Sequence, residues 1–256
     1  MKQKVNLLYH HENQGHGNFG DELSLFIVEK LINKNKYELV VNQEKQELNL
    51  ICIGSYMHAA RRGYYIYGTG IRTLPEGEKG LNFKELNVCA LRGPITYNFL
   101  TQKRNIKCPV LYGDPGLLLL LLYKPFQHIE YADKIALIPH KSNYNNYLNK
   151  GYDKNKFLLI NPRDPWRKVV NLLYSCKSIV SASLHGLIVA DAYSKPNIML
   201  SEFKLEEGYL KFKDYFFSQK RKFTYIKNLE EYNEDNLYKE GNKIDLQKLK
   251  EAFPFQ

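Results

Sequence analysis

Short apolar segments alternate along this chain with amphipathic and polar segments, and this alternation predicts the order of its strands and helices. Leu23, Phe26 and Ile27 recur at helical spacing, which predicts a helix that begins near Asp21 and ends near Ile32. Apolar runs bounded by glycine or polar residues are typical of strands. In the first half of the chain they predict strands at residues 5–9, 37–41, 48–54, 64–68 and 87–91, and a short one at 110–112.

Two further segments of the first half are defined by proline and leucine. Pro94 is tolerated in a first helical turn and predicts a helix over residues 95–102. Six consecutive leucines at 117–122 form the longest purely apolar run. Because a membrane-spanning helix needs about 20 apolar residues, this run predicts buried core. Residues 123–133 are polar and predict a linker between two domains.

The pattern of strand and helix starts again after this linker. It predicts strands at 134–138, 157–160, 178–181 and 197–200, helices at 166–176 and 184–193, an irregular region, and a charged helix at 245–252. Such alternation is typical of an α/β fold with parallel sheets. We therefore predict two Rossmann-like domains, residues 1–125 and 130–215. The tail, residues 216–256, is expected to pack back on one or both of them.

Composition supports a folded protein and narrows its partners. The 256 residues are 44% hydrophobic, which is enough for a substantial core, and the net charge is +10. Residues 201–256 carry 11 basic and 11 acidic residues, so the whole excess lies in residues 1–200. A basic surface attracts nucleic acid, an anionic membrane or a small anion. No run of lysine and arginine is long enough to predict a nucleic-acid partner; an ordinary lysine-rich surface is the alternative.

The cysteines and histidines do not predict a metal site. The four cysteines, at 52, 89, 108 and 176, lack metal-ligand spacing, and three of them lie in or beside apolar segments. Together with the lack of a signal-peptide apolar region near Met1, this predicts a cytoplasmic protein with reduced thiols. His10, His11 and His16 could bind a metal ion only adventitiously.

Candidate ligand-binding residues follow the predicted strands, because ligands of parallel sheets bind beyond the carboxyl ends of strands. Asn18, Gly20 and Asp21 join the first strand to the first helix. Glycine lets a ligand approach the backbone, and Asp21 could bind a sugar hydroxyl or accept its proton; a helix cap is the alternative. The glycine pattern of residues 15–20 is a weak match to a dinucleotide fingerprint. Thr69 follows the strand at 64–68 in the same way.

Two basic positions also follow strands. Arg92 precedes the helix at 95–102, so its guanidinium and the helix N-terminus could bind phosphate or carboxylate. An ion pair with a neighbouring acid is the alternative. His140 and Lys141 follow the strand at 134–138 and favour an anion too; an exposed loop histidine is the alternative.

The segment Ser183-Leu184-His185-Gly186 is the sharpest chemical feature, because it joins an apolar strand to an apolar helix. His185 falls in the first turn of that helix. Histidine exchanges protons near neutral pH, so His185 is the catalytic candidate; a buried histidine with local hydrogen bonds is the alternative. No GxSxG motif accompanies Ser183, which excludes a serine-hydrolase elbow.

These residues together resemble the polysaccharide pyruvyl transferase family. Residues 181–196, SASLHGLIVADAYSKP, are similar to its signature. Further blocks follow in the family's order: residues 18–21 (NFGD), 68–70 (GTG), 91–94 (LRGP), 112–115 (YGDP), 138–140 (IPH) and 213–216 (KDYF). The similarity extends over about residues 5–217.

The resemblance implies a glycosyltransferase-B-like arrangement of two domains with the site in the cleft between them. It implies transfer of pyruvate from phosphoenolpyruvate, a co-substrate, to a sugar, with no cofactor. Arg92 and the Ser183-Leu184-His185 turn would bind phosphoenolpyruvate, and His185 and Asp21 would be catalytic. Some members have arginine at the position of Ser183, and His140, Lys141 or Arg163 could replace that charge.

Two other functions stay open at this point. A nucleotide-sugar glycosyltransferase would use the same basic cleft for a diphosphate, and a non-catalytic module would bind glycan without turnover.

For the pyruvyl transferase, the resemblance implies that the acceptor is a glycan of the bacterial cell surface, either free or lipid-linked. A lipid-linked acceptor would bring the protein to the inner face of the membrane as a peripheral partner.

Overall fold

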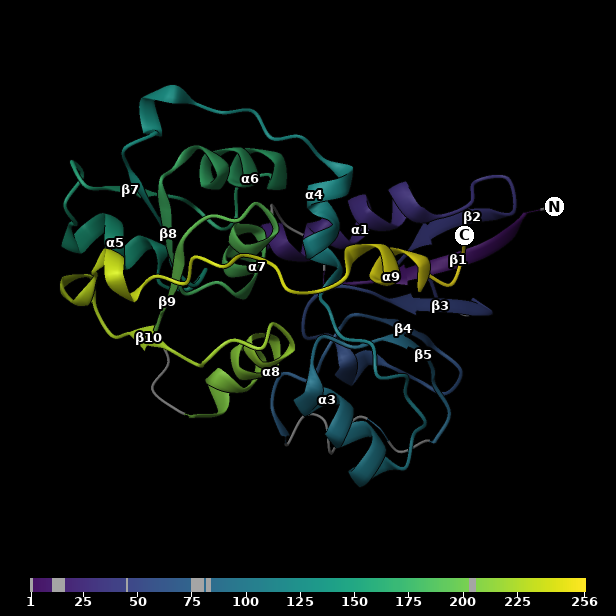
Figure 1. The fold of residues 1–256 in the computed structure, drawn as a ribbon. Coiled ribbons are helices and arrows are strands. Elements are labelled where there is room, and N and C mark those ends of the chain that lie inside the picture. Colours follow the sequence, from purple (N-terminus) through teal and green to yellow (C-terminus); the bar gives the residue numbers. More distant parts are fainter. Residues whose placement is uncertain (1, 11–16, 45, 75–80, 82–83, 203–205) are drawn as a thin grey trace.

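In the computed structural model the chain forms two five-stranded parallel sheets with helices packed against them, which is an α/β fold (Figure 1). The structure describes residues 2–10, 17–44, 46–74, 81, 84–202 and 206–256. The first sheet has the order β2-β1-β3-β4-β5. Its strands are β1 (Gln3–Leu8), β2 (Tyr37–Val41), β3 (Leu48–Ile51), β4 (Tyr65–Tyr67) and β5 (Asn87–Ala90).

The second sheet has the order β10-β9-β8-β6-β7. Its strands are β6 (Ile135–Ile138), β7 (Phe157–Leu159), β8 (Ser178–Ser181), β9 (Asn197–Leu200) and β10 (Tyr225–Ile226). Nine of these ten strands lie within or overlap segments that the apolar pattern predicts. The predicted strand at 110–112 is wrong, since this segment contributes only an isolated bridge between Leu91 and Tyr112.

Helices cover the sheets and connect successive strands. They are α1 (Phe19–Leu31), α3 (Pro94–Asn98), α4 (Leu119–Leu122), α5 (Tyr144–Lys150), α6 (Trp166–Ser175), α7 (Leu184–Ala192), α8 (Leu210–Ser218) and α9 (Leu246–Glu251). A π-helical turn at Phe99–Lys103 continues α3, as expected for a helix over 95–102. None of the helices in the described ranges is both long and apolar enough to cross a membrane.

Each sheet has one point at which the chain reverses the direction in which it adds strands. From β1 the chain adds β2 on one side and then returns to add β3 on the other. From β6 it adds β7 on one side and then β8 on the other. Loops that leave the carboxyl ends of such neighbouring strands diverge and leave room for a ligand. The fold therefore provides one ligand-binding position per sheet.

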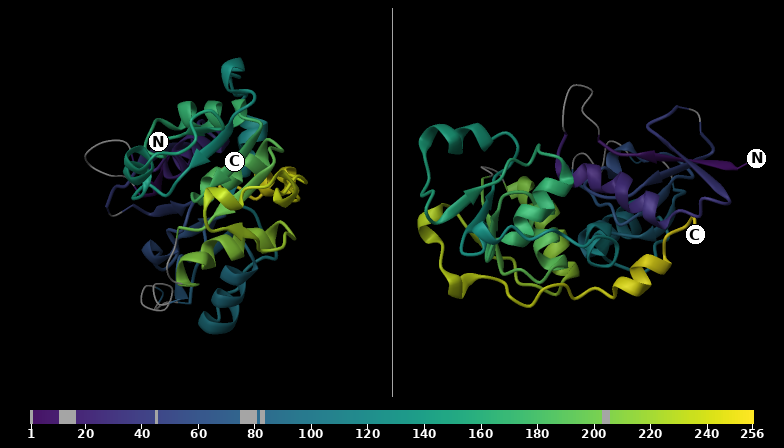
Figure 2. Two further views of the ribbon diagram at one scale, coloured as in Figure 1. Left: turned by 90° about the vertical axis from the view of Figure 1, so that its left-hand side faces the viewer. Right: turned by 90° about the horizontal axis from the view of Figure 1, so that it is seen from above.

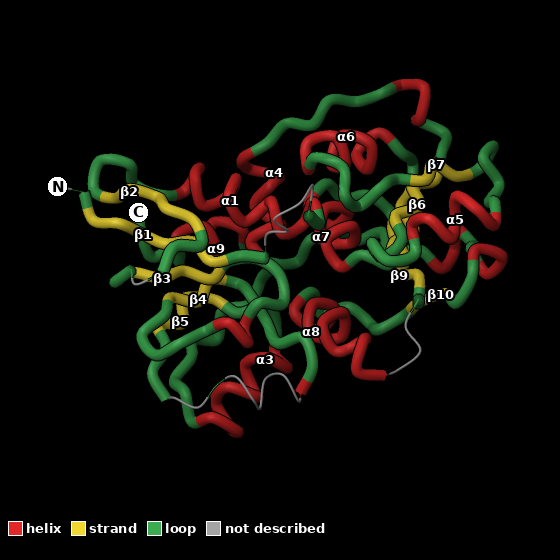
Figure 3. The backbone as a smooth tube through the Cα atoms, turned by 180° about the vertical axis from the view of Figure 1, so that it is seen from behind, coloured by secondary structure: helices red, strands yellow, loops and turns green. Residues whose placement is uncertain are grey.

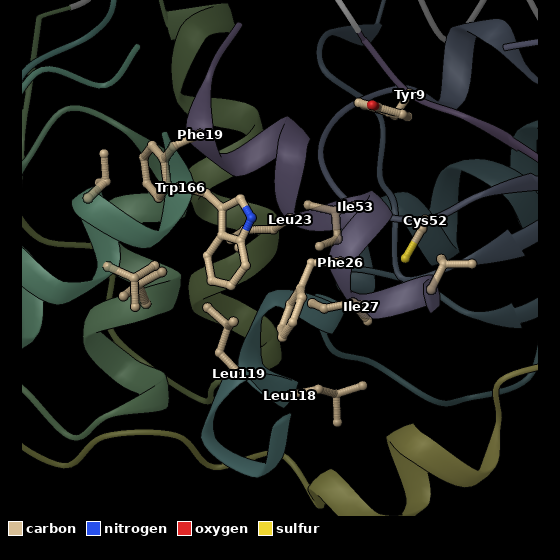
Figure 4. Packing of buried hydrophobic residues seen from close by; sticks show 14 of the residues in the cluster. Tyr9, Phe19, Leu23, Phe26, Ile27, Cys52, Ile53, Leu118, Leu119 and Trp166 are labelled. Atoms are coloured by element: carbon tan, nitrogen blue, oxygen red, sulfur yellow. The ribbon is translucent and has the colours of Figure 1, made fainter. Parts of the chain in front are cut away.

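A single apolar cluster runs through both halves of the molecule (Figure 4). The ring of Phe26 on α1 lies 4.4 Å from that of Trp166 on α6, and Tyr123 packs edge-on against the same Trp166. Leu118 and Leu119, from the leucine run, are fully buried beside them. Leu120 and Leu121 are each 51% exposed, because the short helix α4 buries only one face, so the prediction of buried core is wrong for these two residues. Burial of these large side chains fixes α1, from the first half, against α6, from the second.

The C-terminal segment runs from the second sheet back to the first (Figure 2). Tyr238 pairs with Asn197 at the end of β9, and α9 then lies against the first half. There the hydroxyl of Tyr67 donates a buried hydrogen bond of 2.7 Å to the carbonyl oxygen of Leu249. Phe253 and Phe255 pack against tyrosines of the first sheet. Figure 3 shows the same arrangement from behind, with one group of strands in each half.

Candidate functional site

A cavity of about 630 Å³ lies where the two reversal points face each other. From the first sheet, the segments that follow β1, β3 and β4 line the cavity. From the second half, the lining consists of the segments that follow β6 and β8, together with Pro162 and the start of α8. The chemistry-bearing residues of this lining are His10, Asn18, Asp21, Ser55, His58, Arg72, His140, Lys141, Ser183, His185 and Lys211. Both sheets thus contribute to a single candidate site.

The turn that carries His185 is set by serine hydroxyls. The hydroxyl of Ser181, the last residue of β8, donates to the carbonyl of Ser183 at 2.7 Å and accepts from its N–H at 3.0 Å. These bonds reverse the chain at once, so that Ser183 becomes the N-cap of α7. His185 therefore lies in the first turn of α7, as predicted, and lines the cavity beside Ser183 and Leu184.

His185 packs directly against the start of α1. A Cβ atom at Gly20 would lie only 1.9 Å from the Nδ1 atom of His185, so no larger residue fits there unless the imidazole moves. The ring of Phe19 meets the imidazole edge-on at 6.3 Å. Gly20 therefore permits a close approach of α1 to α7, and its contact with a ligand stays a prediction.

Burial makes the imidazole of His185 neutral. Only 5% of the residue is exposed, and among the described residues its Nε2 atom has no hydrogen-bond partner. Burial, followed by the positive charges of Lys211 and Arg92, lowers the pKa of His185 to about 3. A buried nitrogen without a hydrogen-bond partner is rare in folded proteins and marks this residue of the cavity lining as a functional candidate.

Asp21 shares this part of the cavity with His185. It lies in the first turn of α1, and the side chain of Asn18 caps the helix by accepting from the N–H of Gly20 at 3.1 Å. A Cβ atom at Gly54 would lie 3.2 Å from Oδ1 of Asp21 and 3.8 Å from Cε1 of His185. The carboxylate and the imidazole therefore converge on the same point beside β3.

His140 and Lys141 line the cavity from the segment after β6, the strand that pairs with β8. Burial, followed by the charges of Lys211 and Lys141, lowers the pKa of His140 to about 4. Arg163 is exposed, does not line the cavity, and donates to the carbonyl oxygen of Lys141 at 2.6 Å. Of the three residues predicted to supply a charge beside Ser183, the structure brings only His140 and Lys141 to the cavity.

Thr69 lies behind the residues that line the cavity. It is fully buried; its hydroxyl donates to the carbonyl oxygen of Gly54 at 2.9 Å and accepts from the N–H of Tyr56 at 3.1 Å. Gly54 and Tyr56 both line the cavity, whereas Thr69 does not. Its contacts therefore fix the loop after β3, and its role as a substrate ligand stays a prediction.

Arg92 is fully buried and forms the ion pair that the sequence analysis held as the alternative. Its Nε donates to Oδ2 of Asp214 on α8 at 3.1 Å. Its Nη1 donates to the hydroxyl of Ser55 at 2.7 Å, and its Nη2 donates to the carbonyl oxygen of Ile71 at 2.6 Å. Arg92 does not line the cavity. Direct contact with a bound anion stays a prediction, and the observed contacts hold the cavity wall in position.

Two cavity cations, Arg72 and Lys211, are missing from the sequence-based set. Arg72 follows β4 and its glycine loop, so its place after a strand is a signal that could have found it. Lys211 lies in the region predicted to be irregular, and no motif that precedes it marks it. Both cations act on the buried histidines, because Lys211 lowers the pKa of His185 and of His140, and Arg72 lowers that of His140.

Some sequence-based candidates cannot be compared with the structure. His11 and His16 lie outside the described residues, as does part of the glycine pattern of residues 15–20. Across the remaining, described parts of the chain, no group of three histidine, cysteine, aspartate or glutamate side chains is arranged to hold a metal ion.

The fold and cavity define an α/β protein with lysine and arginine side chains around a cavity that also holds a neutral, buried histidine. The chain belongs to the polysaccharide pyruvyl transferase family, since a sequence model of that family matches residues 18–202. The class of activity is therefore pyruvyl transfer to glycans.

Two curated relatives match most of the chain. The succinoglycan biosynthesis protein ExoV of Rhizobium meliloti is 27% identical over 195 residues, which cover 73% of this chain and 57% of ExoV. An uncharacterized protein of Acanthamoeba polyphaga mimivirus is 26% identical over 203 residues, which cover 77% of this chain and 69% of the relative. Part of each relative thus lies outside the matched region.

A solved structure has the same fold. It is that of a functionally uncharacterized protein from Klebsiella pneumoniae, with a TM-score of 0.52 and 16% identity. The similarity covers 88% of this chain and 93% of the other. Because so few residues are identical, this comparison concerns architecture alone.

Proposed function

We propose that this protein transfers pyruvate from phosphoenolpyruvate to a sugar of a cell-surface glycan, forming a pyruvate ketal and releasing phosphate. The observation that carries the proposal is a cavity in a pyruvyl transferase fold lined by Arg72, Lys141 and Lys211 around His185. Phosphoenolpyruvate carries a phosphate and a carboxylate, so it needs more than one positive group. ExoV takes its name from biosynthesis of the polysaccharide succinoglycan, which supports a glycan acceptor.

The reaction requires one proton donor and one proton acceptor. A sugar hydroxyl adds to C2 of phosphoenolpyruvate while C3 gains a proton; the bond from C2 to the phosphate oxygen then breaks, and a second hydroxyl closes the ketal. We assign proton transfer at C3 to His185 and assistance to the acceptor hydroxyl to Asp21. The imidazole is neutral in the free protein, and a bound dianion would raise its pKa because opposite charge favours the imidazolium.

The proposal includes the setting of the reaction. The two sheets are the two domains of a glycosyltransferase-B-like arrangement, and the cavity lined by both is the cleft that holds the substrates. The protein works in the cytoplasm and meets a lipid-linked acceptor at the inner face of the membrane. The basic excess of residues 1–200 would favour contact with an anionic lipid surface.

The direct test is incubation of the protein with phosphoenolpyruvate and bacterial oligosaccharides. The expected products are inorganic phosphate and a glycan whose mass rises by one pyruvate ketal. Release of a nucleoside diphosphate from a nucleotide sugar, with no reaction of phosphoenolpyruvate, would instead identify a glycosyltransferase. Stabilisation by glycan with no turnover of either donor would identify a binding module.

His185→Gln tests the proposed proton donor. Glutamine keeps a polar group of similar size but exchanges no proton, so kcat is expected to fall by about 10²- to 10⁴-fold. Phosphate release measures the rate, and the melting temperature shows that the fold is kept. Turnover close to that of the unmodified protein would remove His185 from the mechanism.

A further inference from the structure

Lys211 is a cation of the cavity that no motif of the sequence identifies. It is the second residue of α8, and it lines the cavity together with Ser183, His185 and Arg72. Besides burial, the charge of Lys211 is the largest influence that lowers the pKa of His185. The two residues thus face the same cavity, although they belong to different elements.

The Lys211 ammonium group has lost much of its hydration. Burial, followed by the charges of Arg92 and Arg72, lowers the pKa of Lys211 to about 8, and Asp21 acts in the opposite direction. A cation that burial and other cations destabilise gains more from an anionic ligand than an exposed one does. Among the described residues of the cavity lining, Arg72, Lys141 and Lys211 supply positive charge and Asp21 supplies a carboxylate.

The position of Lys211 is fixed by the next turn of the same helix. Asp214 lies three residues further along α8 and is fully buried. Its Oδ1 accepts from the N–H groups of Ile95 and Thr96 at the start of α3, at 2.8 and 3.0 Å, and its Oδ2 accepts from Arg92. These bonds join α8, which belongs to the second half by sequence, to the first half (Figure 1).

The backbone contact at this junction is equally close. A Cβ atom at Gly93 would lie 2.0 Å from the carbonyl oxygen of Asp214, so α8 rests directly on the chain that precedes α3. Arg92 is enclosed at the same point, and each of its guanidinium nitrogens donates to a protein oxygen. Arg92 therefore positions α8, and Lys211 is the group that α8 presents to a ligand.

We propose that the ammonium group of Lys211 binds the phosphate of the donor substrate beside His185, and that Arg92 and Asp214 are positioning residues that hold it there. This inference rests on the proposed function for the identity of the donor, a phosphorylated carboxylic acid. It also explains how a chain with serine at position 183 keeps a cation at this end of the cavity. The positive charge comes from α8 instead of from the N-terminus of α7.

The test compares ligand binding by three proteins in isothermal titration calorimetry, with phosphoenolpyruvate and inorganic phosphate as separate probes. Lys211→Met is expected to raise the Kd for both probes by about 10- to 100-fold, the range for loss of one hydrogen bond to a charged group. Lys213→Met is the matched control, because Lys213 lies on the same helix but outside the cavity. Its Kd values are expected to match those of the unmodified protein.

A relocated charge tests the mechanism more sharply. In the double variant Lys211→Met with Ser183→Arg, a guanidinium extends into the same cavity from α7 and is expected to recover at least tenfold of the lost affinity. If Lys211→Met does not fold, Lys211→Gln replaces it in both the single and the double variant, and the expected changes in Kd are the same. The melting temperature without ligand shows whether each protein is folded.

The outcomes separate the two proposals. Equal Kd values for Lys211→Met and the unmodified protein overturn the role of Lys211, whatever the donor is. Failure of the unmodified protein to bind phosphoenolpyruvate, with phosphate binding that still depends on Lys211, overturns the proposed donor but supports the phosphate site. A similar loss of affinity in Lys213→Met reveals a general charge effect and also overturns the inference.

Discussion

At the scale of single residues, the protein places several ionisable groups where water cannot reach them. His185 is neutral because its surroundings exclude water and contain the cations Lys211 and Arg92. Asp114 shows the opposite case, since its complete burial raises the pKa of its carboxyl to about 6. Arg92, which is also fully buried, forms an ion pair with Asp214. Each arrangement has a consequence for stability.

Burial of neutral His185 predicts a loss of stability in acid. The unfolded state binds a proton near the ordinary pKa of 6.5, whereas the folded state does so only near 3, so stability falls as the pH drops from 6.5 towards 3. At pH 5 this costs about 2 kcal/mol relative to pH 7. Urea titrations of the unmodified protein and of His185→Gln measure the difference, which the variant is expected to lose. An equally large acid effect in both proteins would contradict the prediction.

The buried ion pair predicts a large effect when one partner is removed. Asp214→Ala leaves Arg92 charged and unpaired and also frees the N–H groups of Ile95 and Thr96. The free energy of unfolding is expected to fall by about 3–5 kcal/mol in urea titration. Glu85→Ala is the control, because it breaks the exposed pair of Arg62 and Glu85. A similar urea midpoint for the two variants would show that the buried Arg92 pair stabilises the protein no more than the exposed pair does.

The role of Arg92 also shows the limit of local sequence patterns. Its place after a strand and before a helix correctly predicts that it lies near the carboxyl end of the first sheet. Its partner, Asp214, is 122 residues away in the sequence, and nothing near Arg92 identifies it. The same holds for Lys211, which reaches the cavity only because α8 is attached to the first half.

At the scale of elements, the apolar pattern predicts buried strands better than it predicts helices of mixed character. The sequence analysis expects an irregular region where the structure has α8, so this expectation is wrong for residues 210–218. The buried residues of α8 include the polar Asp214 and Ser218, so its buried face does not stand out as an apolar pattern. Helix α5 was missed because its asparagine-rich sequence, YNNYLNK, lacks apolar residues at helical spacing. Strand β10 was not predicted, because its two residues are too few to form an apolar pattern.

The contact between α1 and α7 predicts an unusual effect of alanine in a helix. At an exposed helical position Gly→Ala stabilises by about 1 kcal/mol. Gly20→Ala is instead expected to destabilise by about 1–3 kcal/mol and to reduce kcat, because its Cβ would overlap the imidazole of His185. Urea titration and phosphate release measure the two effects.

Ser24→Ala is the matched control for this prediction. Ser24 is buried on the same helix, and among the described residues its hydroxyl has no partner, so loss of that oxygen is expected to leave stability and turnover unchanged or slightly improved. A stabilising effect of Gly20→Ala would show that α1 can move away from α7 without cost.

At the scale of the whole molecule, the cavity residues become neighbours because the two sheets share a core and are joined by two crossing connections. One connection is α8, which is tied to α3; the other is the segment that ends in α9, Phe253 and Phe255. The pattern of strands and helices predicts the two parallel sheets, and the structure confirms both. The domain boundaries stay a prediction, as neither the sheets nor the comparisons test them.

The second connection predicts that residues near position 253 stabilise the first sheet. Phe253 is almost fully buried against Tyr67, so Phe253→Ala is expected to lower the free energy of unfolding by about 3–5 kcal/mol. Phe217→Ala is the control, since 47% of that residue is exposed. A denaturation curve with little change for Phe253→Ala would show that the first sheet is stable without this segment.

The returning C-terminal segment also affects how the protein is made. A nascent chain emerges from the ribosome N-terminus first, and its domains generally fold in that order. Here the first sheet emerges early, but Phe253 and Phe255, which cover its tyrosines, are synthesised about 160 residues after its last strand, β5. The first half therefore stays incomplete on the ribosome until translation has passed both sheets. Exposed apolar surface during that interval makes the nascent first sheet a natural client for chaperones.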